Sequence, residues 1–131
     1  MKPKLQLADL QLAIMQVLWQ LSEASVAQVR EALKPDRDLA HTTIATMLTK
    51  MERNGQVDHR VDGRLNIYRP LLAQDRVESS MLGDLYQRLF HGNLNSVVCH
   101  LLEDEDISQT ELNQLKKLIR EKEKELKSKS K

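Results

Sequence analysis

Apolar residues recur with a helical period in the N-terminal part of the chain. After Asp9 they return every three or four residues, which predicts a helix that runs to about residue 21 and buries one face. That face comprises Leu10, Ile14, Val17, Leu18 and Leu21, and Trp19 is expected at its edge. Ser25 and Gln28 have the spacing of a capping box, which predicts the start of a second helix. This helix is expected to end before Pro35 and to bury Val26, Val29, Ala32 and Leu33.

The segment 41–70 combines a third helical pattern with two alternating runs. Ile44, Met47, Leu48 and Met51 form one predicted apolar stripe, and Asn54-Gly55 ends this helix because glycine readily adopts the left-handed cap conformation. No Ser, Asp or Asn stands where a cap for its first turn is expected, in Leu39-Ala40-His41. Alternating residues follow on both sides of Asp62-Gly63, which predicts a tight hairpin.

Three further apolar segments fill the C-terminal part. Residues 75–91 and 108–119 have helical stripes, and residues 94–102 are almost wholly apolar but too short to cross a membrane. Ser108 and Glu111 form a second predicted capping box. The helix that this box opens is expected to run through Leu126, and after Arg120 we expect a solvated helix end that frays into a basic tail.

These helices carry more apolar surface than about 55 residues can bury against one another, so we expect two copies to pack together. The predicted dimer contacts are Leu82, Leu85, Leu89, Val97, Val98, Leu101, Leu112, Leu115 and Ile119.

Helices followed by a hairpin, and then by more helices, predict a mainly α protein with a small β-hairpin wing. We expect a winged helix-turn-helix domain in residues 1–72 and a helical dimerisation domain with a basic tail in residues 73–131. A helix with short polar side chains at its exposed start, followed by a basic hairpin, is typical of winged helix-turn-helix proteins that bind DNA. The candidate DNA contacts are Thr42, Thr43, Thr46, Met47, Lys50, Arg60 and Arg64.

Each of these candidates has a plainer interpretation. Threonines also occur on inert surfaces, although three β-branched residues on one exposed helix face are unusual. Met47 lies on the apolar stripe, so it is expected either to contact bases or to pack in the core. The cations could be solvated charges balanced by Asp58 and Asp62, of which Asp62 is also expected to shape the turn, and Glu23 reads as a helix-terminus charge.

Composition narrows the function classes. The net charge is only +1, so attraction to DNA has to come from local charge, and segment 41–70 carries five Lys or Arg against three acids. A single cysteine, Cys99, excludes an internal disulfide framework and fits a reducing cytoplasm. We expect this thiol to be buried. The N-terminus has no features of a signal peptide.

No catalytic or cofactor constellation stands out. The four histidines are scattered without zinc-ligand spacing, and no nucleophile–base pair or glycine-rich phosphate loop is present. We therefore expect no enzyme activity, no cofactor and no metal. The alternatives to DNA binding are a winged-helix module that docks a protein and a regulator that senses a ligand in its C-terminal domain.

The order of parts, with TTIATMLTKMERNG, DGRLNIYRP and HGNLNSVV, resembles the penicillinase-repressor family of bacterial winged-helix regulators (the BlaI/MecI/CopY type). The similarity extends from about Leu7 to Leu126. It implies a homodimeric repressor whose third helix enters the major groove of a palindromic operator, with wing positions near Arg60 and Arg64 close to phosphate. It also implies that the C-terminal helices dimerise.

The chain departs from that family at two regulatory sites. Members controlled by proteolysis are cut at an Asn-Phe bond in the apolar helix, where this chain has His100-Leu101, so a regulatory protease is not supported. Copper-responsive members carry paired Cys-x-Cys motifs near the C-terminus, and this chain has none.

Overall fold

The computed structural model describes residues 7–129, and the chain divides into two compact units, Met1–Asp84 (unit 1) and Leu85–Lys131 (unit 2). Helix α4 (Gln74–Arg88) runs from one unit into the other. The two units divide inside α4, after Asp84, whereas the domain boundary expected from the sequence lies just before this helix. The first part of α4 belongs to unit 1 because Val77 is buried in the core of that unit and Met81 packs against that core.

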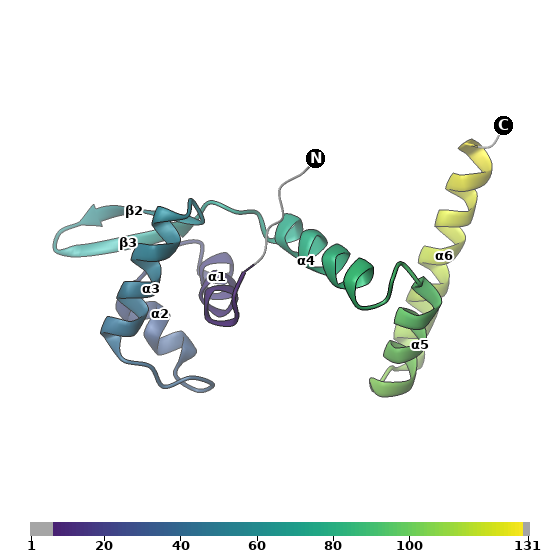
Figure 1. The fold of residues 1–131 in the computed structure, drawn as a ribbon, viewed down its shortest axis with the longest axis horizontal. Coiled ribbons are helices and arrows are strands. Elements are labelled where there is room, and N and C mark those ends of the chain that lie inside the picture. The colour runs from purple at the N-terminus through teal and green to yellow at the C-terminus, as the bar shows by residue number, and fades with distance from the viewer. Residues whose placement is uncertain (1–6, 130–131) are drawn as a thin grey trace. The chain divides into compact units, whose positions relative to one another are not determined.

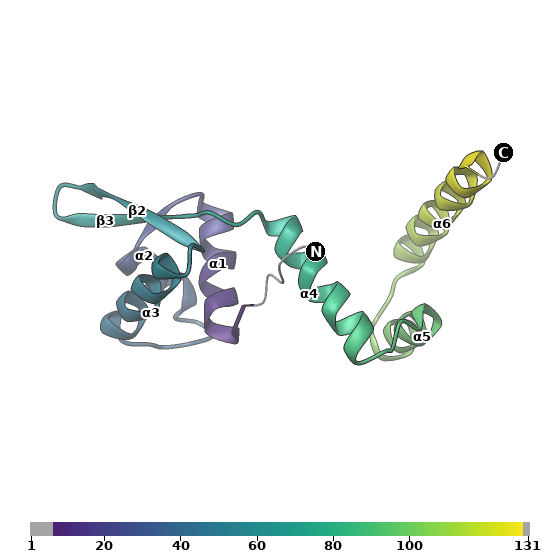
Figure 2. The same cartoon turned by 45° about the horizontal axis from the view of Figure 1, so that its top comes forward.

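Unit 1 contains three helices and a three-stranded sheet ahead of α4 (Figure 1). In chain order the elements are α1 (Asp9–Leu21), β1 (Ala24–Ser25), α2 (Val26–Leu33), α3 (His41–Arg53), β2 (Val57–Asp62) and β3 (Leu65–Pro70). The predicted helices and hairpin are confirmed, whereas β1 was not predicted. The turned view in Figure 2 also shows the β2–β3 ribbon extending beyond α1, α2 and α3.

Local side-chain hydrogen bonds explain where α2 begins, whereas α3 begins without them. Ser25 caps α2, because its hydroxyl accepts from the Gln28 N–H at 3.2 Å while the Gln28 amide oxygen accepts from the Ser25 N–H at 2.8 Å. The predicted capping box is therefore present. Helix α3 starts after Ala40 without a side-chain cap, also as predicted.

The sheet has the strand order β1-β3-β2 and is antiparallel throughout. Its outer strands each pair with β3, so that Ser25 and Arg60 both lie opposite Ile67. The loop between β2 and β3 consists of Gly63 and Arg64, and Gly63 has a φ of 64°. Glycine with positive φ at the first loop position is the requirement of a type II′ hairpin.

The core of unit 1 lies between the helices and the sheet. Its fully buried side chains include Ile14, Leu18, Ile44, Leu48 and Val57. Trp19 is half-buried at the core edge, as expected, and its indole N–H donates to the Leu72 carbonyl at 2.8 Å.

Two residues predicted on buried helix faces are exposed instead. Leu21 is the last residue of α1, and Ala32 is the next-to-last residue of α2. Each lies in the final turn of its helix, where the chain leaves the core.

Unit 2 contains the end of α4, helix α5 (Leu94–Asp104) and helix α6 (Gln109–Lys129). Asn93 caps α5 by accepting from the Ser96 N–H at 3.0 Å, and Ser108 accepts from the Glu111 N–H at 3.1 Å ahead of α6. Helix α4 ends three residues earlier than predicted, before His91 and Gly92, which both have positive φ. Helix α6 continues through Leu126, as predicted, and ends at Lys129, and its residues from 121 to 129 are all exposed.

The helices of unit 2 leave their apolar residues accessible. None of the described residues from 85 to 129 is buried. Val97 and Leu112 are half-buried, while the other predicted dimer contacts are exposed, with Leu89 at 62% and Ile119 at 60%. Cys99 is also exposed, so the prediction of a buried thiol is wrong for the single chain. The few helices of unit 2 in one copy do not enclose these side chains.

No helix in the described part of the chain is both long and apolar enough to cross a membrane.

Candidate nucleic-acid interface

The exposed side of α3 forms one open surface depression. It is lined by Thr42, Thr43, Thr46, Met47 and Lys50. These positions recur at helical spacing, so their side chains share one face of α3. The predicted contact residues of this helix are thus together on a single surface, which combines three hydroxyls, one thioether and one ammonium group.

Met47 contacts the core of unit 1 and also contributes to the exposed face of α3. Its side chain is half-buried and packs against the core of unit 1, and it also lines the depression. The two expectations for this residue, core packing and an exposed contact, therefore do not exclude each other. Ile44, Leu48 and Met51 are fully buried, and they anchor the helix from below.

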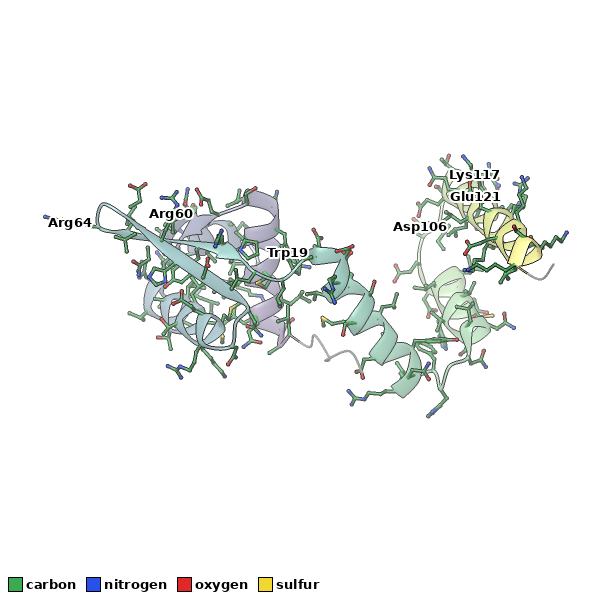
Figure 3. All side chains as sticks on the ribbon, turned by 90° about the horizontal axis from the view of Figure 1, so that it is seen from above. Trp19, Arg60, Arg64, Asp106, Lys117 and Glu121 are labelled. Atoms are coloured by element: carbon green, nitrogen blue, oxygen red, sulfur yellow. The ribbon has the colours of Figure 1, made fainter. Side chains whose placement is uncertain are left out.

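Arg64 lies in the loop of the β2–β3 ribbon, exposed at its tip. Figure 3 shows its side chain pointing away from the rest of unit 1. Arg60 has different surroundings. Its Nη2 group donates to Glu23 at 2.8 Å and its Nε group to the same carboxylate at 3.4 Å, while its Nη1 group lies 3.8 Å from Asp62. The two predicted wing cations are therefore not equivalent.

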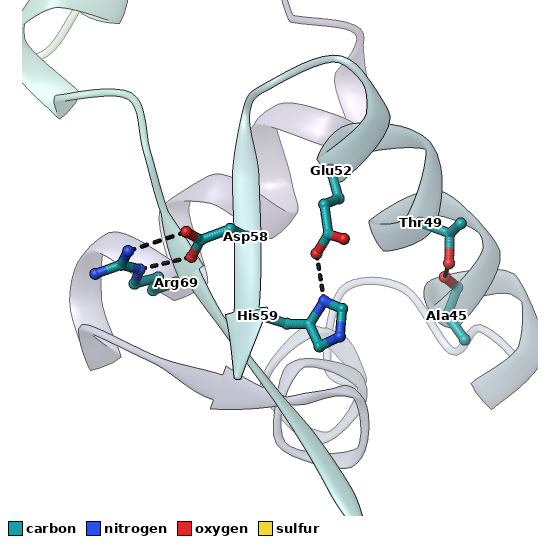
Figure 4. Close-up of polar contacts among 6 residues, drawn as sticks. All are labelled: Ala45, Thr49, Glu52, Asp58, His59 and Arg69. Carbon is teal, nitrogen blue, oxygen red and sulfur yellow. Dashed lines mark hydrogen bonds and ion pairs between the residues drawn. The ribbon is translucent and has the colours of Figure 1, made fainter. Parts of the chain in front are cut away.

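Two more polar contacts organise the root of the ribbon (Figure 4). His59 Nδ1 lies 2.5 Å from a carboxylate oxygen of Glu52, which connects β2 to the end of α3. The His59 ring also stacks at a tilt on Tyr68, with centroids 5.3 Å apart. Asp58 accepts two hydrogen bonds from Arg69, its partner across β2 and β3, at 2.5 and 2.9 Å. Asp58 therefore pairs with Arg69 across the two strands, and not with Arg60 or Arg64 as the plainer interpretation of the wing cations expected.

These contacts shift the titration of the exposed acids. The hydrogen bond from Arg60 lowers the pKa of Glu23 below its ordinary value of 4.5, against a smaller opposing effect of desolvation. The hydrogen bonds from Arg69 lower the pKa of Asp58 below 3.8 in the same way. Both carboxylates therefore stay charged under ordinary conditions.

Sequence reasoning missed the role of Glu23. It was expected to be a helix-terminus charge, but it is the partner of Arg60. Nothing in the local pattern marks this pair, because the two residues are 37 positions apart. The signal that could have found it is strand β1, since Glu23 directly precedes Ala24.

Among the described residues, no group of three or more His, Cys, Asp or Glu side chains is arranged to hold a metal ion.

Three helices, a short third strand and a ribbon with a protruding tip define a winged helix-turn-helix protein. A MarR family protein from Bacillus stearothermophilus shares this fold, with a TM-score of 0.53, 20% identity, and coverage of 92% of this chain and 76% of that one. The model of the penicillinase repressor family matches residues 7–121. The chain therefore belongs to the penicillinase repressor family of DNA-binding transcriptional regulators.

Two relatives show how far this similarity extends. The penicillinase repressor of Bacillus licheniformis is 29% identical over 121 residues, which cover 92% of this chain and 94% of that protein. The transcriptional regulator BlaI of Mycobacterium tuberculosis is 34% identical over 99 residues, or 74% of this chain and 72% of that protein. Both names describe regulators of transcription rather than enzymes.

Proposed function

We propose that this protein is a homodimeric, sequence-specific repressor that binds a pseudo-palindromic operator and blocks transcription. The observation that carries the proposal is the exposed face of α3, where Thr42, Thr43, Thr46, Met47 and Lys50 line one depression. Membership in the penicillinase repressor family supports it. The same proposal places the protein in the cytoplasm, where a bacterial operator would be.

The chemistry of this face suits the major groove. Thr43 and Thr46 would read bases, with Thr42 and Met47 assisting, because hydroxyls can donate to DNA acceptors and methyl groups can contact thymine methyls. Lys50, on the same face, would contact a phosphate. Arg60 and Arg64 of the wing would help to position the unit on the DNA, and the phosphate contacts of the complex would make binding sensitive to salt.

Dimerisation would present two such faces. The exposed apolar residues of α4, α5 and α6 give a second copy a surface to cover, and isologous packing would relate the two copies by a two-fold axis. A two-fold dimer of winged units reads two half-sites about one helical turn of DNA apart, or a multiple of that spacing. An operator occupied in this way would be closed to RNA polymerase.

A gel shift of the purified protein on the DNA upstream of its own gene tests the proposal. We expect a discrete complex that depends on a palindrome, survives non-specific competitor DNA and weakens steeply between about 50 and 200 mM salt. A complex that any competitor removes would contradict sequence-specific binding. It would favour a winged-helix module that docks a protein.

A further inference from the structure

The Arg60 side chain reaches across the sheet. Arg60 is on β2 and Glu23 directly precedes β1, and the central strand β3 lies between β1 and β2. Arg60 is opposite Ile67 of β3, so its side chain has to pass over that strand to donate to Glu23 at 2.8 Å. This ion pair therefore joins the ribbon to the turn between α1 and α2.

The pair separates the two cations of the wing. Two donor groups of Arg60 are directed at Glu23, and a third lies near Asp62. Arg64 is exposed at the ribbon tip, next to the glycine that makes the turn. Arg60 thus lies in a locally neutralised setting, whereas Arg64 presents its charge at the tip.

We propose that Glu23 is a positioning residue for operator binding, which holds Arg60 and thereby fixes the direction of the wing that carries Arg64. This inference rests on the proposed function, and it gives the two cations of the wing different roles. Arg64 contacts the DNA backbone, and Arg60 acts on the operator through the position of the ribbon. A ribbon ordered before binding loses less conformational entropy in the complex.

A positioning role for Glu23 and simple electrostatics predict opposite changes in operator affinity when the Glu23 carboxylate is removed. A carboxylate beside DNA repels phosphate, so removing it should strengthen binding to any sequence. If Glu23 positions the wing, Glu23→Gln should instead weaken binding to the operator by about two- to fivefold, the range that exposed ion pairs support. Binding to an unrelated duplex should stay the same or become tighter.

Fluorescence anisotropy with operator DNA and with an unrelated duplex provides the test, with the wild-type protein measured first. Glu31→Gln is the matched control, because Glu31 is an exposed acid on α2 and its loss changes the net charge equally. We expect the ratio of operator to non-specific affinity to fall for Glu23→Gln alone. Equal ratios in the two variants would overturn the inference while leaving the proposed function intact. A wild-type protein without operator preference would overturn both.

Exchanging the charges tests the pair itself. The double variant Glu23→Arg/Arg60→Glu rebuilds an ion pair with reversed polarity, so its operator affinity should exceed that of either single variant. A double variant as weak as Arg60→Glu would show that Arg60 contacts DNA directly and would overturn the inference. The salt dependence gives a second readout. We expect the slope to decrease by about one for Arg64→Gln and to stay unchanged for Arg60→Gln.

Discussion

Thr46 and Thr49 lie one turn apart on α3 but have different surroundings. Thr46 lines the depression, whereas the Thr49 hydroxyl donates to the Ala45 carbonyl at 3.0 Å and the residue lies outside that depression. At the scale of single residues, the candidate contact face is therefore narrower than the exposed surface of the helix.

Thr46→Arg should abolish operator binding without changing the oligomeric state. The long side chain would fill the depression and displace the base contacts, which require the helix to approach closely. Thr49→Arg adds the same charge to the same helix and should retain a discrete complex in the gel shift. Equal loss in both variants would contradict the assignment of the depression as the contact face.

At the scale of elements, the two helices of the helix-turn-helix, α2 and α3, differ in how they begin. Ser25 caps α2 with its side chain, while Ala40 precedes α3 in an extended conformation and offers no side-chain acceptor. The backbone at residue 40, with φ −67° and ψ 149°, already has the extended conformation of an N-cap residue. A serine there could therefore cap α3 with its hydroxyl.

We expect Ser25→Ala to lower the free energy of unfolding of unit 1 by about 1 kcal/mol and Ala40→Ser to raise it by a similar amount. Denaturant unfolding measures both, followed by the fluorescence of Trp19, the single tryptophan of the chain. A stabilising effect of Ser25→Ala would contradict the role of the capping box.

The ribbon should make the stability of unit 1 sensitive to acid. Glu23 and Asp58 have pKa values lowered by Arg60 and Arg69, so both carboxylates bind protons more readily in the unfolded chain. Their stabilising effect is fully present above the ordinary values of 4.5 and 3.8 and is lost as the pH falls through the lowered values.

Unfolding midpoints measured from about pH 6 to about pH 3 should therefore decrease more for the wild type than for Asp58→Asn. The difference should shrink at high salt, because both pairs are exposed. Parallel curves for the two proteins would show that the Asp58–Arg69 pair does not contribute to stability.

At the scale of the whole molecule, most apolar side chains in the described part of unit 2 are exposed in the single chain and have no covering element there. Leu101 is 53% exposed, and its neighbours on α5 and α6 are similarly accessible. If two copies cover this surface, a charge placed there has to be buried without a partner, which is strongly unfavourable.

Leu101→Glu should therefore convert the proposed dimer into a monomer near 15.1 kDa in sedimentation equilibrium, and operator affinity should fall with it. Trp19 fluorescence should be unchanged, because Trp19 packs against the core of unit 1. Val61→Glu is the control, since Val61 is 66% exposed on the wing and the substitution should leave the dimer intact. A wild-type protein that sediments as a monomer would contradict the dimer.

Most of the fold was predictable because its signals are local. The helical stripe of α3, the capping box at Ser25 and the glycine turn at Gly63 each involve residues a few positions apart. That the candidate contact residues of α3 share one surface was predictable for the same reason, since residues that share a helical period share a face. The role of Glu23 was not, because its partner is distant in the chain.

Sequence by itself determined the type and order of the main elements, because periodicity, capping and turn chemistry act within a few residues. Only the tertiary structure decided that residues 24 and 25 form a third strand, that Trp19 bonds to Leu72, and that Arg60 donates to the distant Glu23. It also decided that the first half of α4 belongs to the core of unit 1. These contacts depend on the path of the chain in space, which no short pattern of residues encodes.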